Sequence, residues 1–454
     1  MASTYLYRTQ VAGTSTKKMT FSAWVRKAET GSYSGLLNCY TSNNDRNGIY
    51  FGSNDRLIVY FRTSSSDHIY YETTRIFRDP TAFIHVVVSI DSTLSTAGDR
   101  VRIYVNGVEE TAFESGAETA PGQDTTFSCI GQNNLDLEVG RMQYGSTVTA
   151  YFSGVMSHVH FVDGTAYPAS TFGETDSTTG EWKIKTNVTG LTYGNNGFFI
   201  LENDNSNLDR SGEGHNQTIG GTLTFTHDNP SNVFCTLNPI TGRSTPTYSL
   251  GNLKTTSSSD GHYVFGTQAS KTGYYEIKLG ATPNGSNGNG LTMGVFDSNY
   301  GDYSLSAVNL RTYKTNHAYD AHYSVDDHGG GNSWEGTTTR ISAAAGDIIS
   351  VAWKNGKLYV AKNGTYFFSA NPSNNTDGST QVLLADSTAY QLPVSKSNID
   401  GMNNSEWNFG NGYFGTTAIT SNSGNGYQDA NGQGKFQYQP PTGCYALCTK
   451  NLNL

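Results

Sequence analysis

The chain is built from short apolar or alternating runs that are separated by clusters of Gly, Asn, Asp and Ser. In the run RVRIYVNGVEE, which begins at Arg100, Asn106-Gly107 provides two positions that tolerate a positive φ, and the chain returns through Val108. This pattern predicts a β-hairpin. Similar runs recur along most of the sequence, whereas no window holds three turns of apolar residues at helical spacing. The pattern therefore favours an all-β fold.

The composition excludes two other classes of protein. Only 15% of the residues are charged, while 12% are aromatic and 51 are glycine. A disordered chain would be richer in charge and poorer in aromatic residues, and a coiled coil would be dominated by Ala, Glu, Lys, Leu and Arg. A length of 454 residues exceeds what one hydrophobic core usually organises, so we expect two or three domains.

The charge pattern, the first residues and the cysteine content each limit what this chain is expected to bind and where it is expected to act. The net charge is −9 and the 29 basic residues form no run, so we expect no nucleic-acid ligand. The first ten residues lack the basic and apolar regions of a signal peptide, and no apolar stretch is long enough to insert into a membrane. The cysteines are too sparse for a disulfide framework, so we expect reduced thiols. They are Cys39, Cys129, Cys235, Cys444 and Cys448.

The strand-like runs fall into two series. Within the second series, Ile348 to Gly364 contains two Asn-Gly turns and predicts a three-stranded meander. Between the series the Asn, Gly and Asp content rises, which indicates a connector with short strands. The predicted organisation is residues 1–182 as a first β-sandwich, 183–244 as an ordered connector, 245–438 as a second β-sandwich, and 439–454 as a C-terminal tail.

Several phrases resemble known families. SAWVRK, FIHVVVSID, RVRIYVNG and GVMSHVHFVDGTAYPASTFG make residues 1–182 similar to a laminin G-like domain of the concanavalin A-like superfamily. TGYYEIKLG, GDIISVAWKNGKLYVAKNG and WNFGNGYFG make residues 245–438 similar to a SPRY-like domain of that superfamily. YGNNGFFI, LDRSGEGHNQT, DNPSNVFCTLNP and QYQPPTGCYALCTKNL resemble structural and tail-fibre-type proteins of tailed bacteriophages, particularly marine ones. The resemblance implies an all-β fold of two jelly-roll sandwiches.

The same resemblance implies a viral function. We expect a virion protein, assembled in the host cytoplasm, that acts as a tail fibre or receptor-binding adhesin contacting host surface glycans. Its partners would be other phage virion proteins and further copies of itself, as a trimer or symmetric array. An alternative is a capsid decoration protein, which is favoured by the lack of a shaft-like repeat in the printed residues.

Catalysis is not expected. Glycosidases of this superfamily place acidic residues alternately on one strand, but no E-x-D-x-x-E phrase occurs. Asp136 and Glu138 could share a strand face, yet such residues are more often solvated edge positions. We therefore expect a non-enzymatic protein, with a polysaccharide depolymerase as the least favoured alternative.

Two polar segments contain residue types that could bind a metal ion. His317 to Gly331 alternates as a strand does, which places His317 and His322 on opposite faces and favours a strand with a polar side. Glu202 to His215 is rich in oxygen ligands but lacks the glycine of a D-x-D-x-D-G loop, so a solvated connector is favoured over calcium. We expect no cofactor, with calcium as the open alternative.

Sugar binding would depend on exposed aromatic rings flanked by Asn and Asp side chains. The resemblance to a SPRY-like domain implies that such a binding site lies in the loops at one end of the sandwich. The candidate ligand-binding residues are Asp297, Tyr300, Tyr303, Asp326, Asp327 and Trp334.

Overall fold

The computed structural model divides the chain into two compact units. Unit 1 comprises residues 1–225 and 229–231, and unit 2 comprises residues 226–228 and 232–454. The structure describes residues 3–144, 148–202, 205–240, 246–256, 262–282, 292–297, 310–314, 321–326, 333–337, 343–376, 382–383, 388–397 and 403–452.

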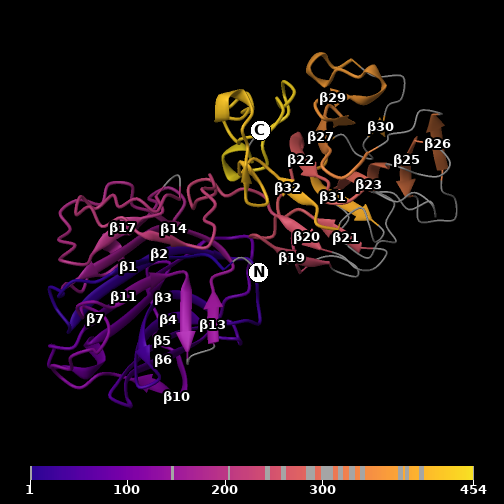
Figure 1. Cartoon of the computed structure of the whole chain (residues 1–454). Helices are drawn as coiled ribbons and strands as arrows, with labels where there is room; N and C mark the ends of the chain where they lie inside the picture. The colour runs from indigo at the N-terminus through magenta and orange to yellow at the C-terminus, as the bar shows by residue number, and fades with distance from the viewer. Residues whose placement is uncertain are drawn as a thin grey trace. The chain divides into compact units, whose positions relative to one another are not determined.

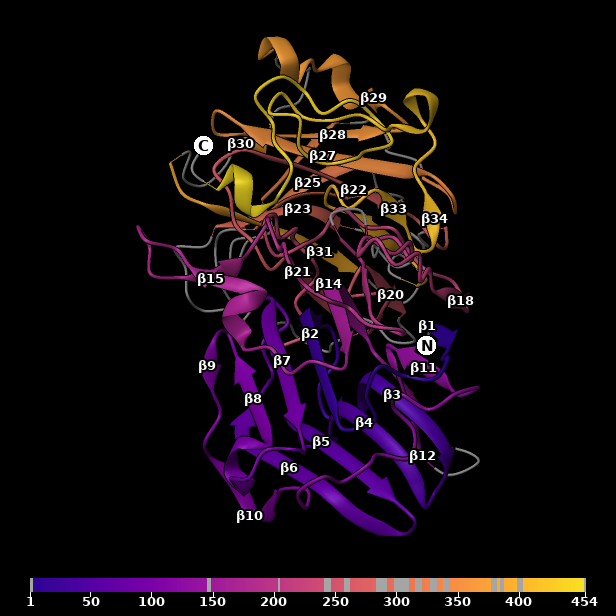
Figure 2. The same cartoon turned by 90° about the vertical axis from the view of Figure 1, so that its left-hand side faces the viewer.

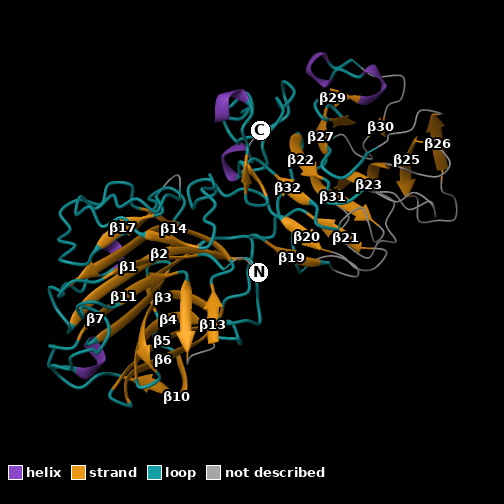
Figure 3. Cartoon of the chain, in the orientation of Figure 1, coloured by secondary structure: helices purple, strands orange, loops and turns teal. Residues whose placement is uncertain are grey.

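Strands are the main regular secondary structure of the described residues, and loops and turns connect them (Figure 3). The helical segments in the described residues are short 3-10 turns: η1 (Ala97–Asp99), η2 (Ala169–Thr171), η3 (Phe367–Ser369), η4 (Pro372–Asn374), η5 (Asn422–Gly424) and η6 (Thr449–Asn451). Across those same ranges, no helix has the length and apolar character needed to cross a membrane.

Unit 1 is a β-sandwich of two antiparallel sheets, named here sheet A and sheet B (Figure 1). Sheet A has the order β10 (Phe113–Thr119), β6 (Ser66–Ile76), β5 (Arg56–Thr63), β4 (Asp45–Phe51), β3 (Ser34–Ser42), β11 (Asp136–Val139), β1 (Tyr5–Thr9) and β18 (Thr218–Gly220). Sheet B has the order β17 (Phe198–Ile200), β14 (Gly154–Asp163), β2 (Lys18–Lys27), β7 (Ile84–Asp91), β8 (Val101–Val105) and β9 (Val108–Glu109). Two hairpins add to them: β12 (Arg141–Tyr144) with β13 (Val148–Tyr151), and β15 (Gly173–Thr175) with β16 (Trp182–Ile184).

The core of unit 1 lies between the inward faces of the two sheets. Figure 2 shows β6, β5, β4 and β3 side by side in sheet A. Alternation along each strand sends one set of side chains inward, and complete burial of each large one contributes about 1.5–3 kcal/mol. Members of this core include Leu57, Val59 and Phe61 of β5, and Val86, Val88 and Ile90 of β7.

The other face of sheet B carries a second, smaller core. Val87 and Val162 of the sheet pack with Phe172 and Tyr193, which lie in the segment that follows β14. His160 stacks on Phe199, with ring centroids 4.0 Å apart, and its Nδ1 lies 2.8 Å from the Tyr193 hydroxyl. Burial lowers the pKa of His160 well below its ordinary value, so this imidazole is neutral.

Unit 2 is also a β-sandwich. Sheet C has the order β19 (Thr247–Ser249), β20 (Lys254–Thr256), β32 (Glu406–Asn408), β22 (Gly273–Lys278), β27 (Ile348–Lys354), β28 (Lys357–Lys362) and β29 (Thr365–Tyr366), with β30 (Val382–Leu383) also paired to β28. Sheet D has the order β21 (His262–Phe265), β31 (Gln391–Ser397), β23 (Thr292–Asp297), β24 (Leu310–Lys314), β25 (Ala321–Asp326) and β26 (Ser333–Thr337). A small hairpin joins β33 (Tyr413–Phe414) to β34 (Thr417–Ala418). The Tyr275 hydroxyl links the sheets by donating to the Gly294 carbonyl at 2.8 Å.

The C-terminal segment packs on sheet C around a buried carboxylate. Glu276 accepts hydrogen bonds from the Tyr274 hydroxyl, the Asn408 amide and the backbone N–H groups of Gln437 and Tyr438, at 2.8–3.1 Å. Burial raises the pKa of Glu276 to about 7, although these donors act in the opposite direction. One side chain thus ties residues 437–438 to the sheet.

The predicted all-β fold of two sandwiches is confirmed. The hairpin appears as β8 and β9 around Asn106 and Gly107, whose φ angles are 49° and 79°. The meander appears as β27, β28 and β29. The segment 183–244, expected to be a connector, is divided between the units: its first part supplies β17 and β18 to the sheets of unit 1. The expected domain limits stay predictions.

The cysteine side chains lie inside the units. All five cysteine side chains are buried, and none of the five forms a disulfide. Burial raises the pKa of Cys444 to about 12 and that of Cys448 to about 11, so both thiols are protonated at neutral pH.

Candidate functional site

Part of the predicted ligand site lies outside the described residues, namely Tyr300, Tyr303 and Asp327. The backbone positions of the other three belong to sheet D. Asp297 ends β23 and Asp326 ends β25, and both strands pair with β24. Trp334 lies on β26, opposite Ser324. The topology therefore brings Asp297 and Asp326 to the same end of this sheet, and the site stays a prediction.

The acidic pair on β11 is not arranged as two free carboxylates. Asp136 is exposed and accepts a hydrogen bond from Thr9 at 2.7 Å. Glu138 is only 6% exposed, and it accepts from Asn38 at 2.9 Å and pairs with Arg141. The interpretation of both as solvated residues is therefore wrong for Glu138. Burial of an unpaired carboxylate would be costly, and the ion pair with Arg141 offsets that cost for Glu138.

The loop considered for calcium is organised by Asp209. Its carboxylate accepts backbone N–H bonds from Phe199, Ser211 and His215 at 2.8–2.9 Å. Burial raises the pKa of Asp209, but these donors outweigh it and the pKa is lowered. Asn203 and Asp204 lie outside the described residues. No group of three His, Cys, Asp or Glu side chains suited to a metal occurs in the ranges that the structure describes.

A cluster of tyrosines lies on the outward face of sheet A. Leu57, Val59 and Phe61 of β5 face the core, so Tyr60 on the same strand faces outward. Tyr60 stands directly opposite Tyr70 of β6, with ring centroids 5.9 Å apart at 81°. We call this surface the tyrosine face; it comprises Tyr33, Tyr50, Tyr60, Tyr70 and Tyr144, with Arg46 and Arg62.

Neighbouring rings extend the tyrosine face toward β3. Tyr50 lies on β4, and Tyr33 approaches it with a centroid distance of 6.2 Å. The Arg46 guanidinium lies 4.9 Å from the ring centroid of Tyr60 and 4.5 Å from that of Tyr144. Tyr33 and Tyr144 are each 48% exposed, and the other rings of the face are partly exposed.

Hydrogen bonds hold the phenol groups in place. The Tyr60 hydroxyl donates to Asp67 and accepts from Arg62 at 3.1 Å. The Tyr70 hydroxyl donates to Glu72 at 2.8 Å. Burial, followed by the hydrogen bond to Glu72, raises the pKa of Tyr70 to about 12. The phenols therefore keep their protons at neutral pH, and the rings are held in fixed orientations.

A hairpin crosses sheet A beside this face. A Cβ added at Gly35 of β3 would lie 2.1 Å from the backbone carbonyl carbon of Arg141, so β12 runs directly over the glycine. Arg141 in turn lies 4.0 Å from the ring centroid of Tyr5, which stacks on Tyr7. A second aromatic group therefore lies on the same sheet, on the side of β1.

The tyrosine face offers two kinds of interaction at once. Exposed aromatic rings present apolar surface, and the arginine and carboxylate groups at their edges donate and accept hydrogen bonds. A flat molecule with apolar faces and polar edges fits this combination. The sequence interpretation placed such a surface in unit 2 and missed this one, although RLIVYFR already alternates inward and outward residues around Tyr60.

Comparison with known proteins bears on unit 1. Residues 2–170 match a laminin G family model described as the concanavalin A-like lectin/glucanases superfamily. Unit 1 contains a laminin G-like domain. The tyrosine face lies entirely within the matched residues of this laminin G-like domain. No curated protein sequence matches the chain.

The solved structures that resemble this chain share little sequence identity with it. A native heptameric SAP-like pentraxin from Limulus polyphemus is 16% identical, with 37% of this chain and 72% of that chain covered and a TM-score of 0.27. Domains LG4-5 of the mouse laminin alpha1 chain are 9% identical over 91% of this chain and 84% of that chain, with a TM-score of 0.30. A putative carbohydrate binding protein from Bacteroides ovatus is 15% identical, with 48% of this chain and 56% of that chain covered and a TM-score of 0.31.

Proposed function

We propose that this protein is a non-enzymatic carbohydrate-binding protein and that its laminin G-like domain holds glycans on the tyrosine face. The observation that carries the proposal is the pair Tyr60 and Tyr70, which stand opposite each other with their hydroxyls tied to Asp67 and Glu72. Pyranose rings have apolar faces and hydroxyl edges, so they suit fixed aromatic rings with polar borders. The matching family model is described as a superfamily of lectins and glucanases, which supports a carbohydrate as the ligand.

Three acidic groups of sheet A support binding rather than hydrolysis. Glycoside hydrolysis needs one protonated carboxyl and one free carboxylate on either side of the scissile bond. Asp67 is paired with Arg62, Glu72 accepts from Tyr70 and Asn54, and Glu138 is paired with Arg141. These carboxylates are committed to neighbouring side chains, which favours a structural role for each of them.

We further propose that the chain is a surface protein of a tailed phage, with unit 2 a SPRY-like sandwich. The glycan would then be a host surface polysaccharide, and the partners would be other virion proteins. Single lectin-like sites bind weakly, so a trimer or symmetric array would convert weak contacts into stable attachment by raising the effective concentration. Labelling the chain on intact particles tests this location: density at the tail supports an adhesin, and density over the whole shell favours a decoration protein.

Binding to host capsule or lipopolysaccharide tests the carbohydrate proposal. Tyr60→Ala and Tyr70→Ala should each weaken binding about tenfold, because each removes one aromatic contact worth about 1–1.5 kcal/mol. Tyr390→Ala is a matched control, since Tyr390 is 42% exposed and belongs to unit 2. Equal affinities for all three variants and the parent would contradict the proposal. Release of reducing ends during incubation would contradict the non-enzymatic part.

A further inference from the structure

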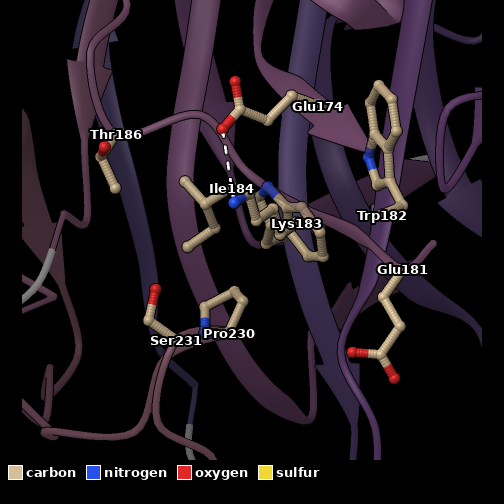
Figure 4. A pocket seen from close by; sticks show the side chains of 9 residues that line it. Glu174, Glu181, Trp182, Lys183, Ile184, Thr186, Pro230 and Ser231 are labelled. Atoms are coloured by element: carbon tan, nitrogen blue, oxygen red, sulfur yellow. Dashed lines mark ion pairs between the residues drawn. The ribbon is translucent and has the colours of Figure 1, made fainter. Parts of the chain in front are cut away.

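A pocket lies on unit 1 away from the tyrosine face, beside the β15–β16 hairpin. Its volume is about 320 Å³. Figure 4 shows Glu174 and Lys183 pointing toward each other, joined by an ion pair of 3.7 Å, with Pro230 and Ser231 coming from a separate segment. A water molecule occupies about 30 Å³ of the liquid, so the pocket is much larger than a single water needs. It lies at the lower end of the range typical of small-molecule sites.

The hairpin that borders the pocket is rigidly held. Asp176 caps its turn by accepting from the N–H groups of Thr178 and Thr179 at 2.8 and 3.0 Å, and it also accepts from Lys183 at 2.9 Å. Trp182 fits against two glycines, because a Cβ at Gly107 or Gly173 would lie 2.5 or 2.4 Å from its ring. The pocket wall is therefore preorganised, which lowers the entropic cost of binding.

An unsatisfied donor belongs to a residue that lines the pocket. Trp24 lines it and is only 5% exposed, yet its indole N–H has no hydrogen-bond partner. Trp24 and Trp182 flank the same histidine, His85, but only the Trp182 indole uses it as an acceptor, at 2.9 Å. A buried N–H without an acceptor is costly, and native structures rarely leave one. The geometry calls for an acceptor that a bound molecule would supply.

The charges around the pocket narrow the class of that molecule. Glu174 and Glu181 present carboxylates, which repel anions. Lys183 and the Trp24 N–H present positive charge and a donor, which disfavour cations. Trp182, Ile184 and Pro230 add apolar surface. Hydroxyl groups both donate and accept hydrogen bonds, so a neutral polyhydroxylated ring suits this mixture of charges and surfaces.

We propose that this pocket binds a single neutral sugar ring, with a ring hydroxyl accepting from Trp24 and another hydroxyl donating to Glu181. The site is independent of the tyrosine face, because the two share no residue. It would recognise a monosaccharide or a glycan end, whereas the tyrosine face would hold an extended chain.

The indole N–H signals in an ¹H–¹⁵N spectrum of the ¹⁵N-tryptophan-labelled full chain test the proposal. The probes are D-glucose, D-galactose, D-mannose and N-acetyl-D-glucosamine, with sodium phosphate and choline as charged competitors. Trp24→Phe identifies the Trp24 signal by its loss; followed through the Trp182 signal from the same pocket, this variant should bind about tenfold more weakly, the effect of one lost hydrogen bond. Glu181→Gln should weaken it several-fold while leaving the fold intact, because Glu181 is exposed. Glu118→Gln, an exposed carboxylate on β10, is the matched control.

A saturable shift of the Trp24 signal by at least one neutral sugar, reduced by Glu181→Gln and unchanged by Glu118→Gln, supports the site. Three results would overturn it: no shift with any sugar, a shift with phosphate or choline alone, or rapid deuterium exchange of the Trp24 N–H without sugar binding, which indicates water only. Tyr60→Ala should leave this titration unchanged, so a failure here is distinguishable from a failure of the tyrosine face.

Discussion

The indole N–H of Trp182 donates to Nδ1 of His85 at 2.9 Å, across the space between the β15–β16 hairpin and sheet B. An indole nitrogen can only donate, so Nδ1 of His85 must be the acceptor. The proton of the neutral imidazole is then on Nε2, where it faces the Ser22 hydroxyl at 2.8 Å. One tryptophan therefore sets the tautomer of a completely buried histidine and attaches the hairpin to the sheet.

Trp182→Phe should destabilise unit 1 by about 2 kcal/mol. The substitution keeps an aromatic ring but leaves Nδ1 of His85 buried without a donor, a loss worth about 1–3 kcal/mol. Urea unfolding followed by circular dichroism measures the change. Tyr33→Phe, on an exposed ring just before β3, should change stability little. Similar midpoints for Trp182→Phe and the parent would show that the hydrogen bond does not anchor the hairpin.

Unit 1 should lose stability in acid because of its buried histidines. Burial lowers the pKa of His85 to about 3 and that of His158 to about 4, against about 6.5 in an unfolded chain. The unfolded state therefore binds more protons between these values, and stability falls as the pH drops from about 6.5 toward 4 and then 3. Unfolding midpoints at several pH values measure how steeply the stability falls with pH. His158→Gln should make this fall shallower. An unchanged slope would mean that other groups cause the acid sensitivity.

Glu276 should give unit 2 the opposite pH dependence. Its pKa is raised to about 7 in the folded protein, against about 4.3 unfolded, so the folded state binds more protons in that window. The contribution of Glu276 is fully present below about pH 4.3 and is lost as the pH rises through 7. The stability difference between the parent and Glu276→Gln should therefore depend on pH between about 4.3 and 7. A constant difference would indicate that Glu276 is ionised throughout.

Gly35→Ala should displace the β12–β13 hairpin. The added Cβ would meet backbone atoms of Arg141, which cannot rotate away as a flexible side chain can. Overpacking of this kind costs about 1–3 kcal/mol. Gly98→Ala is the matched control, because a Cβ there meets nothing within 4 Å. Equal denaturation midpoints for the two variants would contradict the close packing of the hairpin on sheet A.

Local patterns were enough to predict the hairpins but not the order of strands in the sheets. Asn106-Gly107 and Asn355-Gly356 encode tight turns within a few residues, and both appear with the positive φ angles that such turns need. By contrast, β11 lies between β3 and β1 through pairings about 100 and 130 residues apart in sequence, as Glu138 opposite Asn38 and Tyr7 shows. No local signal specifies such neighbours.

In the candidate site too, some features could be predicted from local sequence and others depend on residues brought together by the fold. The outward position of Tyr60 could be predicted from the alternation in β5, since Leu57, Val59 and Phe61 identify the core face. Its pairing with Tyr70 depends on the register of the β5–β6 hairpin, which shifts at two places. The burial of Glu138 could not be predicted, because it depends on Arg141 arriving from a hairpin that crosses the sheet.

Mapping the residues that contact an oligosaccharide prepared from the host surface polysaccharide tests the proposed function most directly. Selectively labelled tyrosine side chains of the full chain report contact through chemical-shift changes during titration. The tyrosine face predicts that the signals of Tyr50, Tyr60 and Tyr70 move together and saturate at one ligand concentration. Shifts confined to tyrosines of unit 2, or no shift in either unit, would contradict it.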